Sequence, residues 1–287
     1  MKLSINDKLP QSEAEWLSTD LFKVDSIDIG SNKVRYAVTD SSDSSDLLTV
    51  MVGGIPRNSD RQLNLPLINK LYGRIAMLAL ANNTTSLMYT HPGTGGSKGD
   101  LFKDTTRDRI TTLTEIVRDV SSKKNIKKIS LIGMSAGSYI VARSVAGIRE
   151  NDLDVESIVL QSPAAFPKEI EDLPYGEKFS KIVRSRWDIN KSPVFTDLDN
   201  IAAQNTGILI SYFQKDDPPI PIHVQNAYYD KAHELMSKGN NITTCTIYNV
   251  EHNFRRIGYE LGQNIVSNDS IRAIGNNITN YIHAQHN

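Results

Sequence analysis

The chain has 287 residues, of which 39% are hydrophobic and 23% are charged, and 32 basic residues against 33 acidic ones give a formal net charge of −1. These values are typical of a globular protein with a buried core, and such a balance favours neither a nucleic-acid groove nor an anionic membrane surface as a partner. No apolar run is long enough for a membrane span, the first residues lack a secretory pattern and Cys245 is the only cysteine, so we expect a cytoplasmic protein without a disulfide.

The N-terminal part of the sequence predicts a β-hairpin, because the β-like runs 22–29 and 33–38 flank Gly30-Ser31-Asn32. From residue 47 onward, short apolar runs alternate with helical periodicity, which is typical of a mostly parallel sheet with crossover helices on both faces. The expected strands are 47–52, 86–89, 129–132, 157–160, 208–213 and 242–250, and the expected helices are 67–78, 107–121, 136–146, 224–236 and 271–282.

Residues 165–205 break this alternation. The segment carries Phe166, Tyr175, Phe179 and Trp187 among many charged residues and has no strand pattern. We expect a small helical insertion there, which could cap a pocket. The sequence therefore predicts one α/β domain over residues 1–287, with a cap insertion at about 165–205.

A candidate nucleophile lies in Gly133-Met134-Ser135-Ala136-Gly137, which matches the pattern Gly-x-Ser-x-Gly. The motif directly follows one expected strand and directly precedes a helix, which is the setting of a nucleophile elbow. A serine on so sharp a turn takes a strained backbone conformation, and side chains at the two glycine positions would clash with the neighbouring strand and helix. The alternative is a plain turn between a strand and a helix.

A serine hydroxyl needs a base to take its proton, and His252 is the candidate. It follows the last expected strand, where a loop at the carboxyl edge of the sheet can reach Ser135. The other histidines lie in or beyond expected helices or, for His91, too early for the chain order Ser–Asp–His of such sites. Asp216 and Asp217 follow the preceding expected strand, and either carboxylate could orient the imidazole.

Together these features resemble the α/β-hydrolase superfamily from about residue 22 to residue 282, and are most similar to its serine-aminopeptidase-like and small esterase-like branches. In that family the acid is commonly followed by two residues and then Val/Ile-Pro. Asp217-Pro218-Pro219-Ile220-Pro221 matches this pattern, so the resemblance favours Asp217 and leaves Asp216 as the alternative acid.

The loops of the family also have counterparts. Its His-Gly-x-Pro oxyanion loop looks like Gly53-Gly54-Ile55-Pro56, which implies that the backbone N–H groups of Ile55 and Ala136 form the oxyanion hole. The loop Thr90 to Ser97 is similar to the family's Asp-x-Arg-Gly-x-Gly-x-Ser but lacks the Asp and the Arg, and Gly53 stands where the family usually has histidine. These departures remove no backbone donor, but they weaken any analogy about the substrate, because such loops shape the pocket.

The resemblance and the motif predict a serine hydrolase that cleaves an ester, a thioester or an amide of a small acyl substrate, most like a carboxylesterase. The catalytic residues would be Ser135, Asp217 and His252, and the reaction would need no cofactor or metal. Two alternatives stay open: an acyltransferase that uses the same triad, and a non-catalytic ligand-binding protein of the same fold. Oligomeric state is not predicted.

Overall fold

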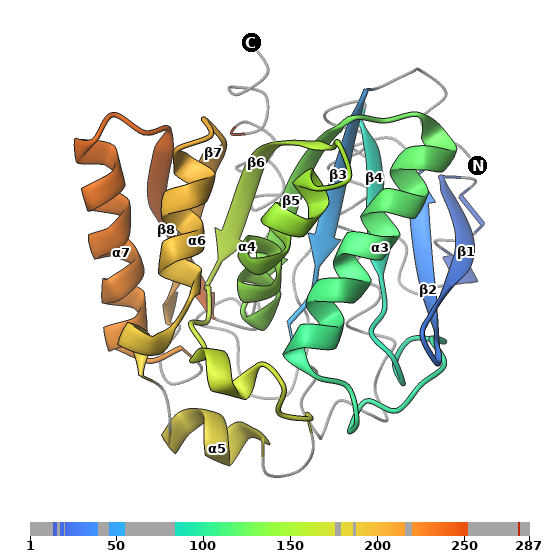
Figure 1. The fold of residues 1–287 in the computed structure, drawn as a ribbon, viewed down its shortest axis with the longest axis horizontal. Coiled ribbons are helices and arrows are strands. Elements are labelled where there is room, and N and C mark those ends of the chain that lie inside the picture. The colour runs from blue at the N-terminus through green and yellow to red at the C-terminus, as the bar shows by residue number, and fades with distance from the viewer. Residues whose placement is uncertain are drawn as a thin grey trace.

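The computed structural model of the chain describes residues 21–39, 46–54, 84–175, 179–185, 188–215 and 220–251, together with residues 14–15, 18–19 and 281. The strands in these ranges are β1 Phe22–Ile29, β2 Asn32–Thr39, β3 Leu47–Val52, β4 Thr85–Tyr89, β5 Lys128–Met134, β6 Asp154–Gln161, β7 Gly207–Lys215 and β8 Ile242–Glu251. They form one sheet in the order β1-β2-β4-β3-β5-β6-β7-β8 (Figure 1).

The first two strands form the predicted hairpin. Ile29 pairs with Asn32, so that Gly30 and Ser31 make a two-residue connection. Gly30 has a φ of 57°, a backbone conformation that glycine adopts without steric cost. Strand β2 then pairs antiparallel with β4, which attaches the hairpin to the edge of the larger sheet.

From β4 to β8 the neighbouring strands are all parallel, as the alternating sequence pattern predicts. All six residues of β3 are buried, which is typical of a strand covered on both faces. Because these strands run in the same direction, their carboxyl ends lie at one edge of the sheet, the lower edge in Figure 1. The strands that the predicted site residues follow in the sequence, β3, β5, β7 and β8, all end at this edge.

Three helices confirm expected ones: α3 (Thr106–Lys124), α4 (Ala136–Arg149) and α7 (Ile222–Ser237). They lie on one face of the sheet together with α6 (Val194–Ala202) (Figure 1). Helix α3 begins with a capping box in which Thr105 and Asp108 bond each other's backbone N–H groups. The expected helix 67–78 lies outside the described residues, as does the helix at 271–282 apart from residue 281.

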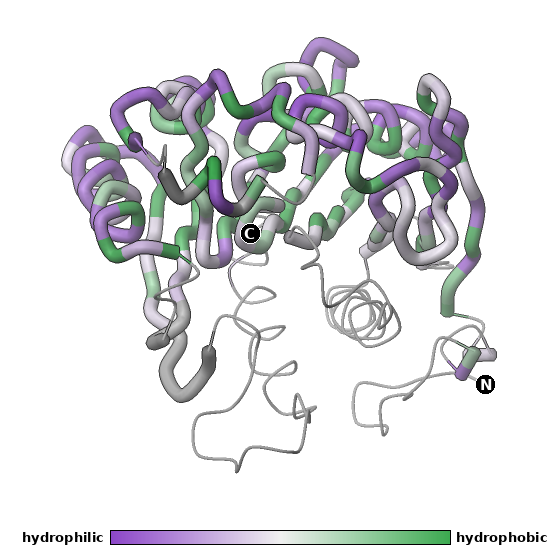
Figure 2. The backbone as a smooth tube through the Cα atoms, turned by 90° about the horizontal axis from the view of Figure 1, so that it is seen from below, coloured by the Kyte–Doolittle hydropathy of each residue, from purple (hydrophilic) through white to green (hydrophobic). Residues whose placement is uncertain are grey.

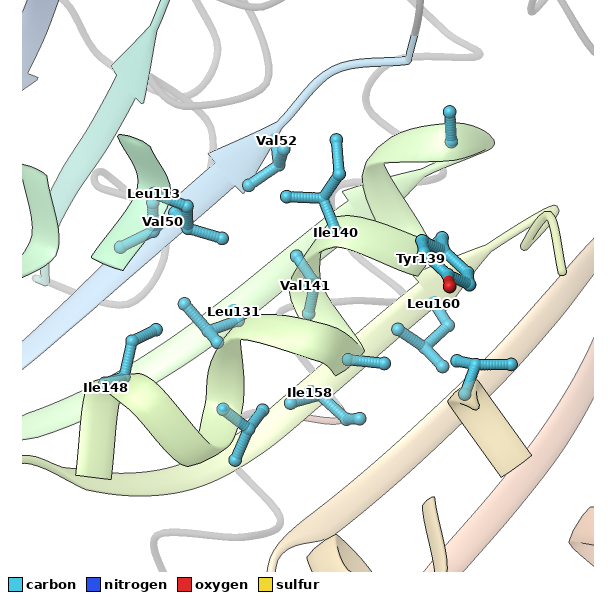
Figure 3. Packing of buried hydrophobic residues seen from close by; sticks show 14 of the residues in the cluster. Val50, Val52, Leu113, Leu131, Tyr139, Ile140, Val141, Ile148, Ile158 and Leu160 are labelled. Carbon is cyan, nitrogen blue, oxygen red and sulfur yellow. The ribbon is translucent and has the colours of Figure 1, made fainter. Parts of the chain in front are cut away.

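Helix α4 lies at the centre of the hydrophobic core, and ten of its fourteen residues are buried. Its apolar side chains pack against those of β3, β5 and β6, among them Ile140, Leu131 and Ile158 (Figure 3). Burial of each such aliphatic side chain contributes about 1.5–3 kcal/mol. This packing fixes where α4 begins, and therefore where Ser135 lies. Figure 2 shows the hydrophobic residues gathered along the strands in the middle of the molecule.

Short helices joined by turns make up the described parts of residues 165–205: η2 Lys168–Ile170, α5 Phe179–Ser185 and η3 Ile189–Lys191 come before α6. Phe166, Tyr175 and Phe179 are buried and pack on one another, with ring centroids 4.6 Å apart for Tyr175 and Phe179. Helix α6 packs against α4 and α7. These aromatic residues belong to the main hydrophobic core, which Phe166 reaches by packing on Tyr139 of α4, and Trp187 lies outside the described residues. A cap over a pocket stays a prediction.

Candidate active site

Ser135 occupies the turn between β5 and α4, with a φ of 56° and a ψ of −123°. A positive φ is strained for any residue with a side chain, and such strain persists only where the surrounding structure over-determines it. Three backbone hydrogen bonds do so here: Ser135 N–H donates to the carbonyl of Gln161 (2.8 Å), and the Ser135 carbonyl accepts from Ser138 (3.0 Å) and Ala164 (3.3 Å). The side chain is half-buried and makes no capping bond to the helix.

The two glycines of the motif are required by close backbone contacts. A Cβ at Gly133 would lie 2.4 Å from Cα of Ser138, and one at Gly137 would lie 2.4 Å from the carbonyl oxygen of Val52. The expectation that bulk at these positions would clash with the helix on one side and the strand on the other is confirmed.

Helix α4 begins directly after Ser135, so the N–H groups of its first turn point toward the Ser135 turn. Ala136 is the first helical residue, so its N–H has no carbonyl partner within the helix. The helix dipole also places partial positive charge at this end. Both effects favour a negatively charged oxygen beside Ser135.

The loop after β3 runs directly past the serine. A Cβ at Gly54 would lie 3.2 Å from Cβ of Ser135 and 3.7 Å from its Oγ, so only a glycine fits here without displacing its neighbours. The structure therefore brings together Ser135, Ala136 and the Gly53-Gly54 backbone. Ile55, the other predicted oxyanion donor, lies outside the described residues.

The predicted acid and base also lie outside the described residues: Asp216 and Asp217 follow β7 directly, and His252 follows β8 directly. The last residues of those strands, Lys215 and Glu251, are partners in the parallel ladder. The ends of β7 and β8 therefore lie side by side, at the edge where β5 ends. Among the described residues, no group of three or more His, Cys, Asp or Glu could hold a metal ion.

His91, which follows β4, is a residue of this site that the sequence reasoning set aside. Its side chain is buried, its Nε2 lies 3.4 Å from the carbonyl oxygen of Gly53, and its ring packs edge-on against Tyr89. Burial, reinforced by the positive charge of Arg109, holds the pKa of His91 well below its usual range. A signal for His91 was available in the sequence. Both β3 and β4 have the apolar pattern of buried parallel strands, so the residues that directly follow them, among them Gly53 and His91, are expected at the same edge of the sheet.

A buried ion pair lies behind His91. Nε of Arg109 donates to Oδ2 of Asp104 at 2.7 Å, and the guanidinium lies 4.1 Å from the ring centroid of Tyr175. Burial raises the pKa of Asp104, and the charge of Arg109 opposes that shift. The pair links the start of α3 to the loop that follows β4.

No model of a known protein family matches the chain, and no curated protein sequence matches it. Solved structures do match it. Est1E from Butyrivibrio proteoclasticus with ferulic acid bound is 13% identical, with a TM-score of 0.60 over 91% of this chain and 98% of that one. An α/β serine hydrolase without a lid from Xanthomonas campestris is 14% identical, with a TM-score of 0.57 over 92% and 94% of the two chains.

Mouse α/β hydrolase domain-containing protein 10 is 12% identical, with a TM-score of 0.55 over 91% of this chain and 99% of that chain. These matches extend over nearly the whole length of both partners. The chain has the α/β-hydrolase fold, as the resemblance seen in the sequence implied, and its structural neighbours include a serine hydrolase and an arylesterase. None of the described helices is long and apolar enough to cross a membrane.

Proposed function

We propose that the chain is a serine hydrolase that cleaves an ester, thioester or amide of a small acyl substrate through an acyl-enzyme on Ser135, with a carboxylic ester as the preferred class. One observation carries this proposal. A serine with positive φ lies between β5 and α4, its flanking glycines have no room for a side chain, and a Cβ at Gly54 would lie only 3.2 Å from the Cβ of this serine. A turn that served only to connect a strand to a helix would not need this strain.

In the proposed reaction Oγ of Ser135 attacks the carbonyl carbon of the substrate, and His252 takes the hydroxyl proton. Asp217, or Asp216 as the alternative, accepts a hydrogen bond from the imidazole and stabilises its protonated form. His252 then gives its proton to the leaving group, and water releases the acyl group by the same steps in reverse order. No cofactor or metal takes part.

The N–H groups of Ala136 and Ile55 would stabilise the negative oxygen of the tetrahedral intermediate. Each donor of this kind contributes about 2.7–4 kcal/mol to the transition state of related reactions. The N–H of Ala136, which has no carbonyl partner within α4, supports its part of the assignment. The structural neighbours, which include an arylesterase and an esterase that binds ferulic acid, support a carboxylic ester as substrate, and the lone Cys245 fits a cytoplasmic location.

The test is hydrolysis of short p-nitrophenyl esters together with labelling by a fluorophosphonate. We expect wild-type protein to turn over the ester, with the label on Ser135 by mass spectrometry, and Ser135→Ala to lose at least about 10³-fold in kcat. Ser144→Ala is the matched control, because this buried serine lies in the same helix and bonds only backbone carbonyls. It should keep near-wild-type turnover.

Variants of the other residues separate the remaining assignments. His252→Ala should lose activity as Ser135→Ala does, and of Asp217→Asn and Asp216→Asn only the first should lose most of it. Product analysis with added alcohols or amines distinguishes hydrolysis from acyl transfer. A folded wild-type protein that neither turns over esters nor takes the label would contradict the proposal and favour a non-catalytic binding protein.

A further inference from the structure

The imidazole of His91 contacts the backbone that enters the loop beside Ser135. His91 follows β4 and Gly53 follows β3, two neighbouring parallel strands, and Nε2 of His91 lies 3.4 Å from the carbonyl oxygen of Gly53. A carbonyl oxygen can only accept a hydrogen bond, so Nε2 carries the proton and donates it. This bond therefore joins the ends of two strands at the edge where the site lies.

The Gly53-Gly54 segment needs such an anchor. Two consecutive glycines have more backbone freedom than any other pair of residues, and neither carries a side chain that could pack and hold the loop. Yet a Cβ at Gly54 would lie 3.2 Å from the Cβ of Ser135 on one side, and a Cβ at Gly137 would lie 2.6 Å from the Gly53 carbonyl oxygen on the other. The Gly53 carbonyl is thus held between the His91 ring and the first turn of α4.

The surroundings of His91 fix which tautomer makes this bond. The ring is buried, packs edge-on against Tyr89 with centroids 5.3 Å apart, and lies in the field of the Arg109 guanidinium. Its Nδ1 is buried and has no hydrogen-bond partner among the residues that the structure describes. A neutral imidazole with its only proton on Nε2 satisfies these conditions, and its proton is directed at the Gly53 carbonyl rather than at Ser135.

We propose that His91 is a positioning residue for the reaction on Ser135: its Nε2–H bond to the Gly53 carbonyl sets the orientation of the Gly53-Gly54 peptide beside Ser135, where the oxyanion of the transition state develops. This inference rests on the proposed serine hydrolase function. His91 touches no reacting atom. Its effect is on the transition state, since an oxyanion exists there and not in the bound ester.

The experiment compares His91→Leu and His91→Gln with the wild type, using the fluorophosphonate for both the rate and the final extent of labelling. Leucine fills the volume without a donor, whereas the side-chain amide of glutamine can supply an N–H in place of Nε2. We expect His91→Leu to lower both the rate of labelling and the kcat of p-nitrophenyl ester hydrolysis about tenfold, equivalent to about 1.4 kcal/mol. The KM for the ester and the final extent of labelling should be unchanged. His91→Gln should recover most of the rate, and His233→Leu, at an exposed histidine of α7, should match the wild type.

The outcomes separate a positioning role from a structural one and from failure of the proposed function. A lowered extent of labelling in both His91 variants, without rescue by glutamine, would show that His91 only supports folding. An unchanged rate in His91→Leu would overturn the proposal while leaving the function intact. If the wild type takes no label, the function itself fails, and long-range ¹H–¹⁵N spectra of the imidazole still test the bond: a proton on Nδ1 would overturn it.

Discussion

Helix α4 is held at its first turn and along its later turns by two different kinds of contact. The first turn is fixed by backbone against backbone, because Gly133 and Gly137 leave no space between the helix, β3 and the Ser135 turn. Further along, the helix is fixed by long side chains: Tyr139 and Arg143 both donate to Oε1 of Glu171, each at 2.8 Å. The two glycines of the first kind of contact stand in one five-residue motif, although Gly137 meets the end of β3, whereas the side chains of the second kind come from residues far apart in the chain.

The side-chain network of α4 also reaches α3 and α6. Oε2 of Glu171 lies 3.3 Å from Nη2 of Arg107, and Nη1 of Arg143 donates to Asp197 at 2.7 Å. Glu171 is fully buried, whereas Arg143 keeps 19% of its side chain exposed. Tyr139 and Arg143 donate hydrogen bonds to this buried carboxylate, and Arg107 pairs with its charge. Removing one partner of a buried charge leaves the others uncompensated, so a single substitution at Glu171 removes the centre of the network.

The largest expected effect in this comparison is that of Glu171→Ala. It removes the acceptor of Tyr139 and leaves Arg143 and Arg107 without their buried carboxylate, so we expect a loss of about 3–5 kcal/mol in the free energy of unfolding. Urea unfolding measures this as a lower midpoint at unchanged m. Glu171→Gln keeps an oxygen acceptor and should lose less, about 1–2 kcal/mol. A loss below about 1 kcal/mol for Glu171→Ala would show that α4 does not depend on this network.

The backbone side of the comparison is tested by Gly137→Ala. The added Cβ would lie 2.4 Å from the Val52 carbonyl oxygen and 2.6 Å from that of Gly53, so one element must move, at a cost of about 1–3 kcal/mol. Because the Gly53 carbonyl is also the acceptor of His91, labelling of Ser135 should slow as well. The same substitution at Gly147, in the same helix, meets only ordinary contacts with Thr114.

Gly147→Ala should therefore be neutral or stabilise the protein by up to about 1 kcal/mol, the helix-propensity difference between the two residues. Equal effects of the two substitutions on the urea midpoint would contradict the close contact at the start of α4. The pair thus separates a general response of the helix to alanine from the specific lack of space beside β3.

The same contrast explains how much the sequence could predict. The strands, three of the helices, and the tight packing around Gly133 and Gly137 follow from local patterns: apolar runs, helical periodicity and one pentapeptide. The bond from His91 to Gly53 and the Glu171 network depend on which strands and helices become neighbours, which no local period encodes. The assignments of Ile55, Asp216, Asp217 and His252 rest on the sequence and stay predictions.

The smallest expected effects come from two carboxylates at the rim of the network, whose pKa shifts have opposite signs. Burial raises the pKa of Asp197, against the opposing effect of Arg143, whereas the hydrogen bond from Arg107 lowers the pKa of the exposed Asp172. The folded protein thus binds the Asp197 proton more tightly than the unfolded chain does, and the Asp172 proton less tightly. By linkage, the protein loses stability through Asp197 as the pH rises above 3.8, the ordinary pKa of an Asp. Asp172 has the opposite effect: it stabilises the protein above pH 3.8, and this stabilisation is lost as the pH falls through its lowered pKa.

Asn variants remove each titration and make the signs measurable. In urea unfolding between about pH 3.5 and pH 6.5, wild type should lose stability relative to Asp197→Asn as the pH rises. Relative to Asp172→Asn it should instead gain stability over the acidic part of that range. The Asp172 difference should shrink with added salt, because the pair with Arg107 is exposed, and the Asp197 difference should persist. If the stability of the wild type changed with pH in the same direction relative to both variants, burial would not be what sets the pKa of Asp197. The buried network would then end at Glu171 and not include Asp197.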